Sequence, residues 1–108
     1  MLTAMKTALA GLPLQSTRKS EASFIEIVLY RKNLPEWLAA LEGLMGPPVK
    51  AEGEKPDKKA TRLAEPYGGV WVDQILFHSQ GADGQIVAMF WPWQDKNHIT
   101  LKVIAQPG

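Results

Sequence analysis

The sequence has no cysteine and only two histidines among its 108 residues. Without cysteine the chain has no disulfide, no thiolate metal site and no thiol nucleophile, and such a composition fits a reducing compartment. An excess of one charge is also missing, because 12 basic residues face 11 acidic ones and the formal net charge is +1. Bulk charge therefore offers no field that would gather polyanions. We expect a cytoplasmic protein that does not bind nucleic acid.

Long apolar runs and familiar catalytic motifs are absent as well. No stretch approaches the about 20 apolar residues that cross a bilayer, and the N-terminal segment lacks the apolar region of a signal peptide. The chain contains no glycine-rich phosphate loop, no HExxH, no EF-hand loop and no GxSxG sequence. These absences favour a protein without membrane contact, and they indicate no cofactor.

The composition that remains is ordinary for a globular protein, with 45% hydrophobic and 21% charged residues. A chain of this length can bury one hydrophobic core without disulfides. We predict a single α+β domain over residues 1–108, with an N-terminal helix and linker in 1–22 and the core in 23–106.

The N-terminal segment carries apolar residues at helical spacing. These residues are Leu2, Met5, Leu9 and Leu12. Gly11 and Pro13 then mark the end of a short helix. Residues 14–22 are mostly polar, so we expect them to form a linker without buried side chains.

The core begins with a strand and the clearest helix of the chain. Residues 24–30 are rich in β-branched and aromatic side chains, which favours a strand with two partly apolar faces. Asn33 as N-cap, Pro35 in the first turn and Glu36 three residues after the cap predict a helix that Gly46 ends. The helix has one apolar stripe, formed by Leu34, Trp37, Leu38, Leu41, Leu44 and Met45.

A long connection follows the main helix. Residues 50–62 alternate lysines with acids, and we expect the lysines at 50, 55, 58 and 59 to solvate a loop. One or two helical turns could form between Asp57 and Ala64. A connection as long as 47–69 is uncommon in a small domain and is usually either disordered or a functional lid. The sequence leaves its role open, with disorder as the simpler interpretation.

The C-terminal third predicts a meander of three strands. Residues 70–79 and 85–93 should form two strands around a hairpin turn at 81–84, and the second of them is apolar on both faces. The last strand alternates from His98 to Ala105. Pro92 cannot donate to a ladder, so it should lie at a strand end, an edge or a bulge. The fold class is therefore α+β with the order α-β-α-β-β-β. We expect two layers, in which one main helix covers a four-stranded, mostly antiparallel sheet.

A sheet that is apolar on both faces needs two covers, and the chain offers one strong helix and one weak one. Either the N-terminal helix or a second copy of the chain could cover the second face. The second possibility predicts a homodimer, with a small molecule or a protein as further partner.

Aromatic residues of the meander, together with one carboxylate, form the candidate ligand or interface site. The residues are Trp71, Asp73, Phe77, Trp91 and Trp93. Three explanations are open, namely core filling, a ligand pocket lined by rings, and a dimer interface with tryptophan hot spots. Asp73, placed between aromatic residues, could act as a base if burial raised its pKa, and more often such a residue is solvated.

Three other residues are weak candidates for a metal site. Glu26, His78 and His98 would form a two-histidine, one-carboxylate site if adjacent strands brought them together. The simpler interpretation is that both histidines are solvated, because His78 lies near a hairpin loop and His98 begins a strand on its polar side.

The order of strand, helix and three strands from residue 24 onward is similar to one module of the vicinal oxygen chelate superfamily, in which paired modules hold a divalent metal. The resemblance implies a βαβββ module that is a metal-dependent enzyme or a ligand-binding protein. Glu26 and His98 occupy comparable strands, although the first strand lacks the family's usual histidine. Our first prediction of function is a small homodimeric, non-catalytic binding module, and the alternative is a protein of this superfamily type.

Overall fold

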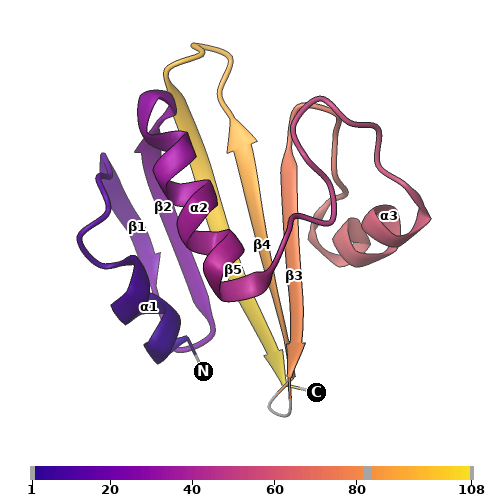
Figure 1. The fold of residues 1–108 in the computed structure, drawn as a ribbon, viewed down its shortest axis with the longest axis horizontal. Coiled ribbons are helices and arrows are strands. Elements are labelled where there is room, and N and C mark those ends of the chain that lie inside the picture. Colours follow the sequence, from indigo (N-terminus) through magenta and orange to yellow (C-terminus); the bar gives the residue numbers. More distant parts are fainter. Residues whose placement is uncertain (1, 82–83, 108) are drawn as a thin grey trace.

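A five-stranded antiparallel sheet forms the centre of the computed structural model, which describes residues 2–81 and 84–107 (Figure 1). The strands lie in the order β1-β2-β5-β4-β3, and every neighbouring pair is antiparallel. Their bounds are β1 Ser16–Ser20, β2 Phe24–Tyr30, β3 Ile75–Gly81, β4 Gly84–Pro92 and β5 His98–Pro107. The α+β class is confirmed, but the sheet has five strands where the sequence predicted four.

Within residues 2–81 and 84–107, three α-helices accompany the sheet. They are α1 Thr3–Leu9, α2 Leu34–Met45 and α3 Lys58–Ala64. Two single turns of 3-10 helix, η1 Arg31–Asn33 and η2 Glu65–Tyr67, precede α2 and follow α3. Figure 1 shows α1 and α2 in front of the sheet and α3 on the side of β3. No helix in the described ranges is both long and apolar enough to span a bilayer.

Alternation along the strands separates two apolar clusters, one on each face of the sheet. The face that α1 and α2 cover, here called the helix face, holds the larger core. Its buried strand residues are Ile25, Ile27, Leu29, Ile75, Phe77, Ala88, Phe90, Ile99, Leu101, Val103 and Ala105. The opposite face, here called the second face, holds a smaller cluster of Leu76, Val87 and Met89 under Ala60 and Ala64 of α3.

The main helix is confirmed with the bounds that its end signals predicted. Pro35 lies in the first turn, and Gly46 adopts a positive φ of 82° that ends the helix. Asn33 occupies the cap position, but its side chain does not accept from the helix backbone. Instead its amide Nδ2 donates to Glu36 Oε1 at 3.2 Å. Leu34, Trp37, Leu41 and Met45 form the buried side of α2.

The prediction of a linker over residues 14–22 is wrong, because Ser16–Ser20 form the edge strand β1. An edge strand pairs on one side only and can expose polar side chains on most positions. Four of the five β1 residues are exposed, so the segment lacks the apolar alternation that marks an inner strand.

The prediction of a strand over residues 70–79 is wrong in its first half, because β3 begins at Ile75. Residues 70–74 form a loop that is held against residues 50–54. Gly53 N–H donates to the Val72 carbonyl at 2.8 Å, and Leu76 N–H donates to the Lys50 carbonyl at 3.0 Å. The hairpin turn expected at 81–84 includes residues 82 and 83, which lie outside the described ranges.

Helix α3 covers part of the second face. The sequence left open whether this part of the long connection is a loop or one or two helical turns, and it forms a helix. Asp57 caps this helix, with Oδ1 accepting from Ala60 N–H at 2.8 Å. The N-terminal helix does not cover this face, because α1 packs beside α2 on the helix face. The half of the second face over β3 and β4 is therefore covered. The other half, here called the open half, is lined by Glu26, Tyr30, Trp91, Trp93 and Lys102.

A matched pair of substitutions in α2 tests this packing. Leu41 is fully buried against the sheet, whereas Leu44 on the outer side of the same helix is exposed. Replacing Leu41 by Ala leaves a cavity and should lower the free energy of unfolding by about 2 to 5 kcal/mol. Leu44→Ala should change it by no more than about 0.5 kcal/mol. Urea unfolding followed by circular dichroism measures both, and equal losses would contradict the placement of α2.

Candidate functional site

The five residues predicted as a ligand or interface site do not form one site. Phe77 is fully buried in the core of the helix face and makes an edge-on contact with Phe90 at a centroid distance of 6.3 Å. Trp91 lies on the second face beside the smaller cluster. Core filling is therefore the role of Phe77, and the sheet separates it from Trp91.

Trp91 and Trp93 help to line the open half of the second face. The Trp93 indole Nε1 donates to Thr100 Oγ1 at 2.8 Å, and the Lys102 ammonium lies 4.4 Å from the centroid of the Trp91 ring. The His98 ring lies 4.9 Å from Trp93, again between centroids. Trp93 remains 39% exposed, so these rings cover the strands beneath them and also face solvent.

Trp71 and Asp73 lie on the loop that precedes β3, and both are exposed. Trp71 is 67% exposed and is not a core residue. Asp73 was placed between aromatic side chains by the predicted strand, and this placement is wrong because the strand starts later. Asp73 therefore faces solvent, which the sequence indicated as the more common situation for such a residue.

A buried lysine anchors this loop, contrary to the prediction that all lysines of the long connection are solvated. Lys50 is only 2% exposed, and its ammonium donates to the carbonyl oxygens of Ala51, Val72 and Gln74. Desolvation lowers the pKa of Lys50 below its ordinary value of 10.5, while Asp73 is the largest of three nearby acids that oppose this shift. Three carbonyl acceptors make the buried ammonium tolerable and fix the loop conformation.

The structure does not bring the three candidate metal ligands together. Glu26 lies opposite Lys102 in the sheet and forms an ion pair with Arg18 Nε at 3.6 Å. His78 Nε2 lies 3.0 Å from Gln85 Oε1. His98 contacts Asp95, whose pKa is lowered by hydrogen bonds, first from the Asn97 backbone N–H and then from His98. Within the described ranges, no cluster of three acidic or histidine side chains could hold a metal ion.

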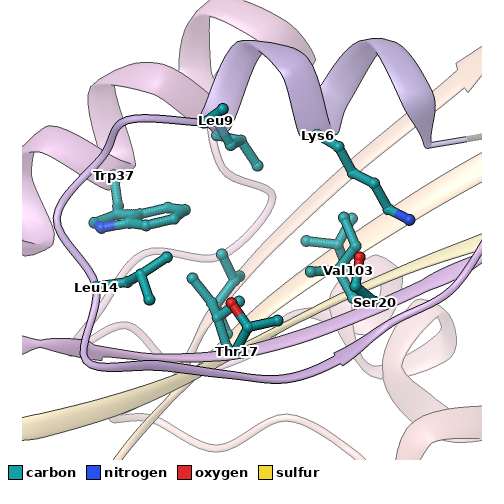
Figure 2. A pocket seen from close by; sticks show the side chains of 11 residues that line it. Lys6, Leu9, Leu14, Thr17, Ser20, Trp37 and Val103 are labelled. Carbon is teal, nitrogen blue, oxygen red and sulfur yellow. The ribbon is translucent and has the colours of Figure 1, made fainter.

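A concave pocket, here called the cavity, lies under the helices in the described part of the chain. It is partly open to solvent and has a volume of about 160 Å³ between α1, the start of α2 and strands β1, β2 and β5 (Figure 2). The lining residues are Lys6, Leu9, Ala10, Leu14, Thr17, Ser20, Ile25, Ile27, Trp37, Leu101 and Val103. Ile25, Ile27, Leu101 and Val103 form a buried apolar floor.

The segment between α1 and β1 arches over one end of this cavity. Gly11 adopts a positive φ of 92°, which turns the chain after the helix. The Trp37 indole Nε1 donates to the Pro13 carbonyl at 2.8 Å, and Gln15 N–H donates to the Val28 carbonyl at 2.8 Å. Figure 2 shows Trp37 and Leu14 at the arched end, and Lys6 and Ser20 at the other.

A β-bulge in β1 aims two hydroxyl-bearing residues at the cavity. Residues three apart on a regular strand point to opposite faces. In β1 the pairing shifts between Thr17 and Lys19, so Thr17 lies opposite Ile27 and Ser20 lies opposite Ile25. Both partners belong to the helix face, and both hydroxyl residues line the cavity as a result.

The sequence prediction missed this site entirely. The sequence places Trp37 in the apolar stripe of the main helix. A buried indole N–H requires an acceptor, and this requirement is the one sequence signal that could have pointed to the contact at the cavity. Thr17 and Ser20 lie within residues 14–22, which the sequence predicts to be a linker. Comparisons with protein-family models, with curated proteins and with solved structures found no match for this chain. Geometry alone therefore supports the function proposed below.

Substitution of Lys50 tests its role as the anchor of the loop. Lys50→Met keeps an unbranched side chain but removes three hydrogen bonds to backbone carbonyls, and it should lower the free energy of unfolding by about 1 to 3 kcal/mol. Lys55→Met, on an exposed residue of the same connection, should change it by less than about 0.5 kcal/mol. Urea unfolding compares the two variants, and a neutral Lys50→Met would contradict the anchoring.

The pH dependence of the same variant tests the lowered pKa of Lys50. Between this pKa and 10.5 the unfolded chain binds more protons than the folded one, so Lys50 makes stability rise with pH in that window. Burial raises the pKa of Tyr67, and this shift makes stability fall with rising pH. The effect of Tyr67 is the same in the wild type and in Lys50→Met. The wild type should gain stability relative to Lys50→Met as the pH approaches 10.5. A difference that is constant with pH would contradict the shift.

Proposed function

We propose that the protein is a non-catalytic binding module and that its ligand is a small apolar molecule held in the cavity between α1, α2 and the sheet. The observation that carries the proposal is a cavity of about 160 Å³ whose floor is apolar and buried. Ligand sites are typically concave and mostly apolar, with a few placed polar groups.

The size of the cavity limits the size of its ligand. An apolar cavity of about 150 Å³ in another protein stays free of water and binds benzene. A ligand with about six to eight carbon atoms therefore matches this volume. With about seven heavy atoms at about 0.6 kcal/mol each, the binding free energy is about 4 kcal/mol, which corresponds to a Kd near 1 mM.

Titration with hexan-1-ol, followed through the indole N–H signals in NMR spectra, tests the proposal. Trp37 is the one tryptophan that lines the cavity. Its signal should shift and saturate, whereas the signals of Trp71, Trp91 and Trp93 should stay in place. An unchanged Trp37 signal at saturating hexan-1-ol would refute the proposed site.

Two variants of β1 provide the matched control. Thr17→Phe places a ring in the cavity, and Ser16→Phe places the same ring on the opposite face of the strand, where Ser16 pairs with Val28. Thr17→Phe should abolish the shift of the Trp37 signal because its ring occupies the ligand volume. Ser16→Phe should retain hexan-1-ol binding, and the reverse pattern would contradict the assignment.

As a second candidate we propose that the open half of the second face is a homodimer interface. Tyr30 at 38% and Trp93 at 39% are exposed there, and aromatic residues of this kind act as anchors at interfaces. Glu26 lies directly opposite Lys102 on this face. A two-fold axis could therefore set each charge against the opposite charge of a second copy.

Light scattering after size-exclusion chromatography tests this second candidate. The wild type should elute with twice the mass of the chain, and Trp93→Glu should reduce it to a monomer because a buried carboxylate is costly at an interface. Trp71→Glu, on the exposed loop before β3, is the matched control and should leave the dimer intact. A wild type that stays monomeric at high concentration would rule out the dimer.

A further inference from the structure

Two polar side chains of the cavity lining, those of Lys6 and Ser20, lie at one end. Among the lining residues Lys6 carries the one formal charge, and no acidic side chain lines the cavity. Figure 2 shows the Lys6 ammonium beside Ser20, at the end away from Trp37 and Leu14. The cavity therefore has an apolar end and a cationic end.

The Lys6 ammonium is positioned and retains donors for a ligand. It donates to the backbone carbonyl of Glu21 at 2.6 Å. An ammonium has three N–H donors, so two remain. None of the ion pairs in the described part of the chain involves Lys6, so no carboxylate of those residues neutralises its charge.

The bulge of β1 adds neutral donors to the lining of the cavity, Ser20 near Lys6 and Thr17 closer to Leu14. It directs both Thr17 and Ser20 to the cavity side, which a regular strand would not do for residues three apart. Hydroxyl groups can donate to an anion next to the ammonium. Bulges commonly re-aim side chains at binding sites.

We infer that the ligand of this cavity is a short-chain monocarboxylic acid in its ionised form. This inference rests on the proposed function and specifies its ligand class. The carboxylate lies at Lys6 and Ser20, and the alkyl chain or ring extends over Ile25 and Ile27 toward Trp37. One ammonium and one hydroxyl match the single charge of a carboxylate, whereas sites for phosphate usually combine several cationic or backbone donors.

Three probes with the same alkyl chain separate the head group from the tail. Hexanoate, hexan-1-ol and hexylamine differ in charge, and each is titrated at neutral pH and low salt while the Trp37 indole signal is followed. Hexanoate should bind about tenfold more tightly than hexan-1-ol, as expected for a charge-assisted hydrogen bond. Hexylamine should bind more weakly than the alcohol, because its ammonium meets that of Lys6.

Substitutions of Lys6 assign this preference to the ammonium. Lys6→Met keeps the apolar stem and should bind hexanoate and hexan-1-ol equally, with the affinity for hexan-1-ol unchanged. Lys6→Arg should retain the preference for hexanoate. Lys58→Met, at the start of α3 on the second face, is the matched control and should behave as the wild type.

The outcomes distinguish this inference from the proposed function. Saturable binding of hexan-1-ol without a preference for hexanoate overturns the carboxylate assignment and leaves the apolar site intact. A preference that survives in Lys6→Met overturns the role of Lys6. Absence of binding for both probes overturns the proposed function and the inference together.

Discussion

The helix face of the five-stranded sheet is larger than the two helices that cover it, and this mismatch is the constraint on which the rest of the structure depends. The seven residues of α1 rise about 10 Å, whereas the ten residues of β5 extend about 33 Å. Because α1 ends at Leu9 and an arch of loop residues continues over β1 and β2, the apolar floor at Ile25 and Ile27 is not filled from above. The cavity is the direct result of this shortfall, and the proposed function rests on it.

The second face of the sheet must also be covered by few helical residues, and its cover is of a different kind. Helix α3 places Ala60 and Ala64 over β3 and β4, where their small side chains permit close packing. Over β2 and β5 the cover consists of the sheet's own large side chains, with Trp93 hydrogen-bonded to Thr100. Such amphipathic side chains cover apolar surface and still expose polar atoms. The second face is thus less dependent on a partner than its apolar sequence suggested.

Local signals made part of the fold predictable, and long-range contacts made the rest unpredictable. The cap, proline and glycine around α2 lie within the helix or next to it, so its bounds were predicted correctly. Strand β1 is defined by pairing with β2, and its polar residues carry no periodic signal of their own. The burial of Lys50 depends on carbonyls of residues 72 and 74, and the cavity depends on the relative lengths of elements. Neither can be inferred from composition or spacing.

Crystallography under xenon pressure tests the cavity most directly, since xenon enters apolar cavities of this size. The structure predicts one xenon site bounded by Trp37, Ile27 and Leu101, without displacement of α1. Crystals with no xenon there, and with the side chain of Leu14 folded into the space instead, would show that the sheet is fully covered by the chain itself. That result would contradict the cavity and the binding function built on it.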